Sequence, residues 1–109
     1  MPILRFHSVK KEDVIKAGTE FQAKLANTFE TGTDNITLEV IESTFICNAE
    51  IENTPYPMVE ILSFKRAKQI EDNVVNVIAN TLKELGYYGC DIFYTHLAKE
   101  CYYVDGKSL

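Results

Sequence analysis

The chain has 109 residues, of which 46% are hydrophobic and 25% are charged, and its formal net charge is -5. This length fits a single domain, 1–109, because domains cluster at about 100 to 150 residues. The acidic balance argues against binding of DNA or RNA, which relies on Lys and Arg to displace counterions. No apolar run approaches the roughly 20 residues that cross a membrane, and the start lacks a signal-peptide pattern. We therefore expect a cytoplasmic protein that binds neither nucleic acid nor membrane.

The first part of the chain predicts a strand, a helix and a second strand. Residues 2–7 form a short apolar run that opens on Pro2, and proline is tolerated at the first position of a strand. From about Lys10, apolar residues recur at three- and four-residue steps, which predicts an amphipathic helix that ends near Gly32. Alternating apolar side chains predict a second strand over residues 35–46.

The second part repeats this order after a turn-rich connection, residues 48–57, that we interpret as the seam between two halves. Residues 58–64 predict a third strand. A helical stripe over residues 70–85 stops at Gly86, because glycine is favoured just after a helix. Residues 90–97 predict a fourth strand, and within a C-terminal extension, 99–109, residues 102–106 predict a short strand or an Asp-Gly turn.

The two halves, at about 2–47 and 56–98, follow one pattern. The offset between Pro2 and Pro57 also aligns apolar positions within the halves: Leu4 with Val59, Phe6 with Ile61, and Leu38 with Phe93. We therefore expect an α+β fold of two right-handed β-α-β units related by pseudo-twofold symmetry. In this fold a four-stranded mixed sheet carries both helices on one face.

Side-chain alternation places Arg5, His7, Thr37 and Glu39 on the other face of the sheet, which is too polar for a second core. Two interpretations stay open for this face. It is either exposed to solvent with cross-strand pairing, or it is a polar surface between subunits.

Cysteines and histidines indicate neither a metal site nor a nucleophile. The three cysteines include no Cys-x-x-Cys pair, so we expect reduced thiols that take part in packing. His7 and His96 have no metal-ligand spacing, and no Ser-His-Asp or Cys-His arrangement can be argued from the sequence. We expect no metal and no cofactor.

The Met-Pro start, the element order and the duplication resemble the tautomerase superfamily, which includes macrophage migration inhibitory factor and oxalocrotonate tautomerase. Residues 2–6, residues 40–46 and the Tyr102-Tyr103 ending are more narrowly similar to an uncharacterised bacterial family of unknown function attached to that superfamily. The resemblance implies a homotrimer with sites between subunits. A ferredoxin-like binding module has the same element order and stays open, although it normally joins its middle strands more tightly than residues 48–57 suggest.

The resemblance further implies keto-enol tautomerisation of a small carbonyl compound, with Pro2 as the catalytic base. In the superfamily, removal of the initiator methionine exposes proline as an N-terminal secondary amine. A free α-amino group has a pKa of about 7.7 to 8.0, and burial or a nearby cation lowers it toward the pH at which a base works best. This role requires removal of Met1, because an acylated proline nitrogen is an amide and cannot accept the proton.

Substrate-binding positions follow from the same resemblance. They are Lys10, Thr33, Ser63, Phe64, Lys65, Phe93 and Thr95. Several differ in kind from the polar groups of the superfamily, and Glu39 stands where oxalocrotonate tautomerase carries a substrate-holding arginine, so an anion would be repelled there. These differences support an alternative function, a catalytically inactive oligomeric or small-molecule-binding protein on the same scaffold. Whether the chain is an enzyme is therefore left open by its sequence.

Overall fold

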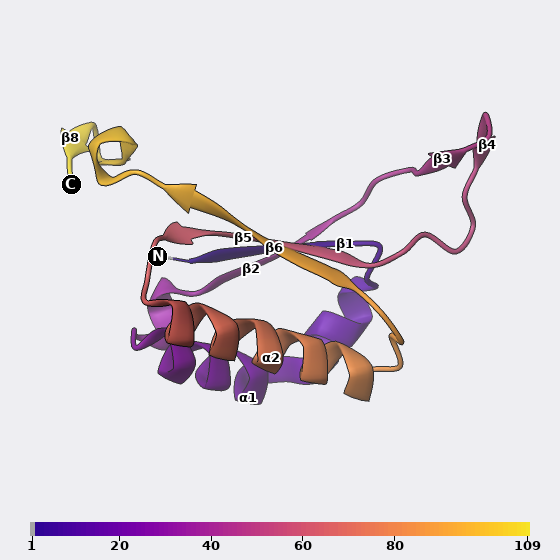
Figure 1. Cartoon of the computed structure of the whole chain (residues 1–109), viewed down its shortest axis with the longest axis horizontal. Coiled ribbons are helices and arrows are strands. Elements are labelled where there is room, and N and C mark those ends of the chain that lie inside the picture. The colour runs from indigo at the N-terminus through magenta and orange to yellow at the C-terminus, as the bar shows by residue number, and fades with distance from the viewer. Residues whose placement is uncertain (1) are drawn as a thin grey trace.

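The computed structural model describes residues 2–109 and consists of a four-stranded mixed sheet with two helices on one face (Figure 1). In spatial order the strands are β2 (Thr37–Ile41), β1 (Ile3–His7), β5 (Met58–Phe64) and β6 (Asp91–Leu97). The helices are α1 (Lys11–Phe29) and α2 (Lys68–Glu84). The central pair β1 and β5 is antiparallel, and each outer strand runs parallel to its neighbour. The predicted α+β architecture is confirmed.

The core lies between the sheet and the two helices. Alternate side chains of each strand point into it, and so does one face of each helix, on which side chains recur every 3.6 residues. Every second residue of the central strands faces the helices and is at most 1% exposed: Leu4, Phe6, Val59 and Ile61. The helices contribute the apolar stripes predicted from the sequence, including Phe21, Leu25 and Phe29 from α1 and Val74, Ile78 and Leu82 from α2. Burial of these side chains is the main driving force for the fold.

The two prolines of the duplicated pattern occupy equivalent places. The N–H of Thr37 donates to the carbonyl oxygen of Pro2 at 3.0 Å, and the N–H of Asp91 donates to that of Pro57 at 3.0 Å. In each half, the proline therefore precedes a central strand and its carbonyl anchors the start of the parallel outer strand.

The predicted alignment of Leu38 with Phe93 is wrong by one residue. Leu4 pairs with Leu38, whereas its equivalent Val59 pairs with Ile92. Leu38 and Ile92 both pack against the core, while Phe93 points to the other face and is 45% exposed. A shift of one residue along a strand moves each side chain to the opposite face.

Two predicted elements are shorter in the structure. The first helix ends at Phe29 because Glu30 takes a left-handed conformation (φ 61°), and it is kinked at Gly18 (φ 65°, ψ -155°). The second strand ends at Ile41, not near residue 46. Its neighbour β1 ends at His7, which pairs with Ile41, so the chain has no partner for further ladder bonds there.

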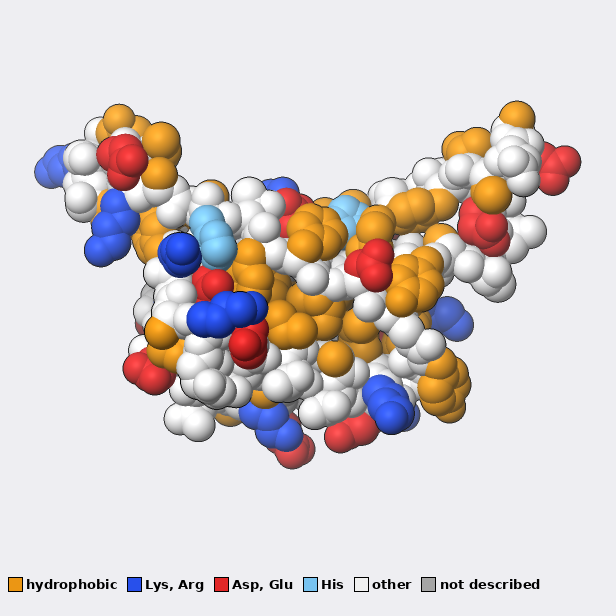
Figure 2. Space-filling view, viewed as in Figure 1, with side chains coloured by type: hydrophobic (Ala, Val, Ile, Leu, Met, Phe, Trp, Pro, Cys, Tyr) orange, Lys and Arg blue, Asp and Glu red, His pale blue; other side chains and the backbone are white. Residues whose placement is uncertain are grey.

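Two small hairpins project from opposite ends of the sheet, away from the helices (Figures 1 and 2). The hairpin arm pairs β3 (Ile46–Cys47) with β4 (Glu50–Ile51), inside the segment predicted as strand end and loop. The C-terminal hairpin follows the short helix η2 (Lys99–Cys101) and pairs β7 (Tyr103–Val104) with β8 (Lys107–Ser108) through the predicted turn, in which φ is 51° at Asp105 and 76° at Gly106. Both hairpins expose apolar side chains.

On the polar face of the sheet, charged and polar side chains of neighbouring strands form pairs. Arg5 Nε lies 2.8 Å from Glu39 Oε1, and Thr95 donates to Glu60 at 2.9 Å. Cross-strand pairing on this face is therefore confirmed. None of the helices within residues 2–109 is long and apolar enough to cross a membrane.

The three cysteines are free thiols, as expected, but only Cys90 packs against the core. Cys47 and Cys101 are exposed because they lie in or beside the projecting hairpins, so their predicted packing role is wrong. Burial, with the neighbouring Asp91 carboxylate, raises the pKa of the Cys90 thiol, which makes it a weaker nucleophile.

Candidate functional site

Pro2 lies at the start of the central strand β1, where its side chain is less than 2% exposed. The register that pairs Ile3 with Leu62 places Pro2 opposite Ser63. Ser63 is 1% exposed, and its hydroxyl has no hydrogen-bond partner within residues 2–109. It faces the helices, as Ile61 does two residues earlier, so it borders the buried Pro2 ring rather than an open pocket wall. A buried hydroxyl without a partner costs about 1 to 3 kcal/mol.

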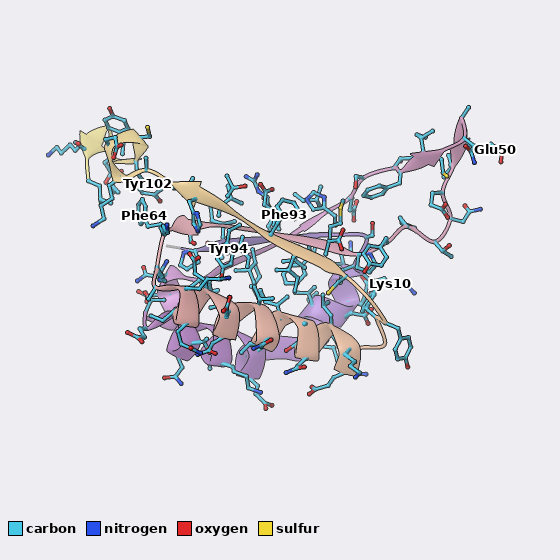
Figure 3. All side chains as sticks on the ribbon, in the orientation of Figure 1. Lys10, Glu50, Phe64, Phe93, Tyr94 and Tyr102 are labelled. Atoms are coloured by element: carbon cyan, nitrogen blue, oxygen red, sulfur yellow. The ribbon has the colours of Figure 1, made fainter. Side chains whose placement is uncertain are left out.

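Two further predicted site residues lie at this same end of the sheet, which we call the Pro2 end. Phe64 is half-buried and meets the ring of Tyr102 edge-on, with ring centroids 5.4 Å apart (Figure 3). Lys65 follows β5 and is exposed. The C-terminal extension thus covers one side of the Pro2 end.

Thr33, Thr95 and Phe93 lie farther from Pro2. Thr33 begins the short helix η1 (Thr33–Asn35) before β2, is exposed, and accepts a hydrogen bond on its carbonyl from Gln22 at 3.1 Å. Thr95 and Phe93 lie on the polar face, where the Thr95 hydroxyl is engaged by Glu60. The structure therefore does not direct their side chains toward the buried ring of Pro2.

Lys10 lies at the opposite end of the sheet, at the start of α1 (Figure 3). Its N–H donates to the Tyr87 hydroxyl at 3.0 Å, and that hydroxyl donates to Asp13. Lys10 borders an open hollow of about 390 Å³ that also contacts Ser8 and Ser43. Strand β1 rises about 3.3 Å per residue, so Lys10 and Pro2 of one chain are more than about 15 Å apart.

The acidic residue expected to repel an anion, Glu39, forms an ion pair with Arg5. Arg5 reaches it across the strands at 2.8 Å and also lies 3.9 Å from Glu60. The repulsion inferred from the sequence is therefore offset locally, although the pair is partly exposed and weak.

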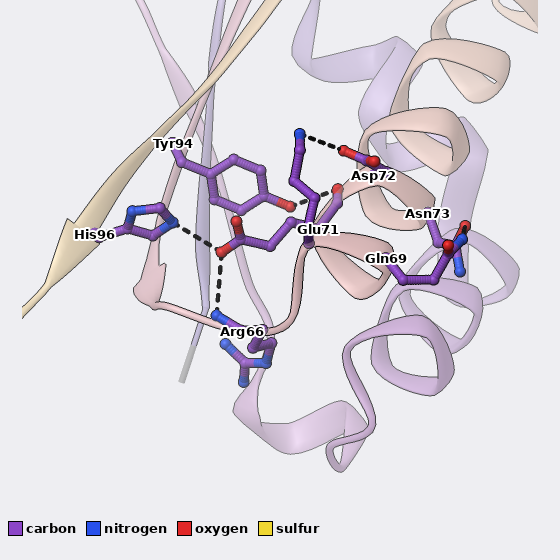
Figure 4. Close-up of polar contacts among 8 residues, drawn as sticks. Arg66, Gln69, Glu71, Asp72, Asn73, Tyr94 and His96 are labelled. Atoms are coloured by element: carbon purple, nitrogen blue, oxygen red, sulfur yellow. Dashed lines mark hydrogen bonds and ion pairs between the residues drawn. The ribbon is translucent and has the colours of Figure 1, made fainter.

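A cluster that sequence reasoning missed lies beside the Pro2 end (Figure 4). The carboxylate of Glu71, a residue only 7% exposed, accepts a hydrogen bond from the backbone N–H of Arg66 at 3.1 Å and lies 2.8 Å from His96 Nε2. Burial alone would raise the pKa of Glu71, but the bonds from Arg66 and His96 outweigh it and lower the pKa. Glu71 thus stays ionised and ties β6 to the start of α2.

Tyr94 completes this cluster. Its hydroxyl donates to the Glu71 carbonyl at 2.8 Å, and its ring stacks on His96 with centroids 5.4 Å apart. Burial, together with the Glu71 carboxylate, raises the pKa of Tyr94, so it remains a neutral donor. The sequence contains one signal for this group, the acidic Glu71 in the first turn of a helix. The contacts of Glu71 with β6 could not be predicted, because they depend on the strand register that pairs Ser63 with His96.

Solved structures similar to this chain share its fold. The structure of a DUF1904 domain of unknown function from Sebaldella termitidis is 24% identical, with a TM-score of 0.88 and 97% of each chain covered. A macrophage migration inhibitory factor-like protein from Entamoeba histolytica is 13% identical, with a TM-score of 0.73 over 99% of this chain and 98% of the other. A fused 4-OT asymmetric trimer is 6% identical, with a TM-score of 0.80 over 97% and 94%.

At the level of sequence, the family model described as a domain of unknown function, DUF1904, matches residues 1–108. A comparison with curated proteins gave no match.

Proposed function

Because this chain belongs to the DUF1904 family, whose function is unknown, and has a tautomerase-like fold, we propose that it catalyses keto-enol tautomerisation of a small carbonyl compound with Pro2 as base. The observation that carries the proposal is the placement of Pro2. Its ring is buried at the start of a central strand, and its carbonyl is fixed by Thr37, so a nitrogen freed by loss of Met1 would sit in a defined position.

The chemistry requires only a neutral amine and a polarised carbonyl. The amine of Pro2 takes a proton from the carbon next to the carbonyl, the electrons of that C–H bond form the C=C bond, and the π electrons of the carbonyl move to its oxygen, giving an enolate that takes its proton from the Pro2 ammonium or from water. Where water protonates the oxygen, the ammonium loses its proton to solvent, so Pro2 is again a neutral amine. A positioned base of this kind contributes about 10²- to 10⁴-fold to the rate. Met1 itself lies outside the described residues, so its removal is part of the proposal.

We further propose that the functional unit is a homotrimer with sites between subunits. Lys10 and Pro2 are at opposite ends of β1, so a site that uses both needs two chains. The name of one structural neighbour identifies it as an asymmetric trimer. Association would also cover the open face of the sheet and the apolar side chains of the two hairpins.

The test compares the two structurally equivalent prolines. In protein shown by intact mass to lack Met1, Pro2→Ala is expected to lower kcat/KM for phenylpyruvate by about 100-fold. Pro57→Ala is the matched control, because Pro57 has the same place in the other half but can never be N-terminal. A glycine inserted before Pro2 should abolish turnover, since it converts the amine into an amide.

Equal turnover in all variants would remove Pro2 from the mechanism. If native protein retains Met1 in full, the remaining candidate is an inactive binding protein on this scaffold. That candidate is favoured by Glu39, which stands where oxalocrotonate tautomerase carries a substrate-holding arginine and whose carboxylate is here engaged by Arg5.

A further inference from the structure

Arg66 is a half-buried cation whose guanidinium forms no ion pair within residues 2–109. Its Nη1 donates to the Phe64 carbonyl at 3.1 Å and its Nε to the Phe29 carbonyl at 3.3 Å. The guanidinium also lies over the Phe29 ring, 5.0 Å from the centroid. Within the part of the chain that the structure describes, no carboxylate forms an ion pair with it, whereas Arg5 pairs with two. A guanidinium keeps its charge at physiological pH, so Arg66 presents a fixed positive charge.

These contacts hold Arg66 at the Pro2 end of the sheet. Phe64 is the last residue of β5, beside the residue opposite Pro2, and Phe29 is the last residue of α1. Arg66 therefore links two elements that end where β1 begins, and the loop from β5 to α2 passes this point (Figures 1 and 4).

Of the other charged groups around the Pro2 end, Glu71 is ionised but engaged by hydrogen bonds, and Glu30 and Lys65 are exposed. Glu71 on α2 is held by His96 of β6 and by the backbone of Arg66. Glu30 after α1 and Lys65 after β5 are exposed, where water and salt screen their charges. Residues 36 and 37, which flank Pro2 from β2, are uncharged. Of the two cations that follow β5 at the Pro2 end, Arg66 is thus partly buried and Lys65 is exposed, so the charge of Arg66 is the less screened.

We propose that Arg66 holds the Pro2 amine in its uncharged form once Met1 has been removed. A fixed cation disfavours a second positive charge nearby, and burial of the proline ring acts in the same direction. The uncharged amine is the form that accepts a proton. Arg66 acts through Pro2 and is therefore a positioning residue rather than a catalytic one, and its role rests on the proposed function.

The experiment measures the pH at which the Pro2 amine gains its proton. Protein without Met1, treated with methionine aminopeptidase where needed, is labelled with ¹³C-proline, and the Pro2 signals are followed by NMR against pH. The chain has 3 prolines, and only one can be N-terminal, so the titrating signal is unambiguous. In the wild type we expect a midpoint below the usual α-amino range of about 7.7 to 8.0.

Two variants distinguish the effect of the Arg66 charge from that of its hydrogen bonds and packing. Arg66→Gln removes the charge but keeps an amide donor, and we expect its midpoint to rise by about one pH unit. Arg66→Lys keeps the charge and should stay near the wild type. Lys83→Gln, which removes an exposed cation from the far end of α2, is the matched control and should change nothing. Thermal unfolding verifies that each variant folds.

Three outcomes would overturn the proposal: a wild-type midpoint within or above the usual range, no change in Arg66→Gln, or equal changes in the Gln and Lys variants. The wild-type midpoint is measured without any variant, so it tests the proposal even if Arg66→Gln fails to fold. The titration is independent of turnover. A lowered midpoint without tautomerase activity counts against the proposed function alone, whereas activity with an ordinary midpoint counts against Arg66 alone.

Discussion

Within residues 2–109, Glu71 is the charged residue that is buried. It is an acidic side chain in a buried position, where an unpaired charge would be expensive. The N–H of Arg66 and the imidazole of His96 supply the missing partners, and the net effect is a pKa below the ordinary value of 4.5. A group whose pKa falls on folding stabilises the folded state above its unfolded pKa, and this contribution is lost as the pH drops through the folded pKa.

Glu71→Gln is therefore expected to lower the free energy of unfolding at pH 7 by about 1 to 3 kcal/mol. The difference from the wild type should narrow as the pH falls below 4.5, because the unfolded wild-type chain then binds a proton at Glu71 before the folded protein does. Urea unfolding at pH 7 and pH 3 measures both effects. Glu84→Gln, at the exposed end of the same helix, is the control. A difference that does not depend on pH would contradict this account.

At the scale of the elements, α1 combines a regular apolar stripe with an interruption. The sequence spacing assigns Gly18 to the stripe that faces the core, yet its φ of 65° and ψ of -155° are not helical. This conformation is essentially restricted to glycine. The kink separates the first turns, which carry Lys10 and the Asp13 contact to Tyr87, from the longer part that packs on the sheet.

Gly18→Ala tests whether this kink is required. A Cβ at this position would meet nothing within 4 Å, so the cost comes from the backbone alone. We expect a loss of about 1 to 3 kcal/mol in the free energy of unfolding. The neighbouring exposed Thr19→Ala should stay within about 0.5 kcal/mol of the wild type. An unchanged unfolding midpoint for Gly18→Ala would mean that α1 straightens at no cost.

For the whole molecule, the two projecting hairpins are the feature that a single chain does not explain. Ile46 and Ile51 are directly paired in the hairpin arm and are 64% and 65% exposed. Such an arm has no core of its own, and a two-stranded hairpin is marginal in water. We therefore expect it to be covered by another copy in the proposed trimer.

Replacing both isoleucines, Ile46→Ser with Ile51→Ser, should dissociate the oligomer, because each fully buried isoleucine contributes about 1.5 to 3 kcal/mol. Light scattering coupled to size exclusion would then report the mass of one chain instead of three. Ile15→Ser is the matched control, since Ile15 is 73% exposed on α1. Persistence of the trimer in the double variant, or equal dissociation with Ile15→Ser, would rule out the arm as the interface.

How much the sequence predicts depends on the range of the interactions. The element order, the two apolar helix stripes, the stop at Gly86 and the Asp105-Gly106 turn all follow from local periodicity and backbone preference. The residue at which β2 ends could not be predicted in this way, because it depends on where the neighbouring strand β1 ends. The alignment of Leu38 with Phe93 failed because strand register is set by pairing across the sheet.

For the candidate site, too, some features follow from the sequence and others only from the tertiary structure. The sequence alone determined that a proline follows Met1 at the start of a strand in a duplicated pattern, whereas the central place of this strand comes from the sheet order. Only the tertiary structure decided that Ser63 is buried beside it, that Lys10 lies at the far end, and that Arg66, Glu71 and His96 gather nearby. The contact of Glu71 with His96 and the pairing of the strand of Pro2 with that of Ser63 join residues far apart in the chain, and they exist only once the strands have paired and α2 has packed on the sheet.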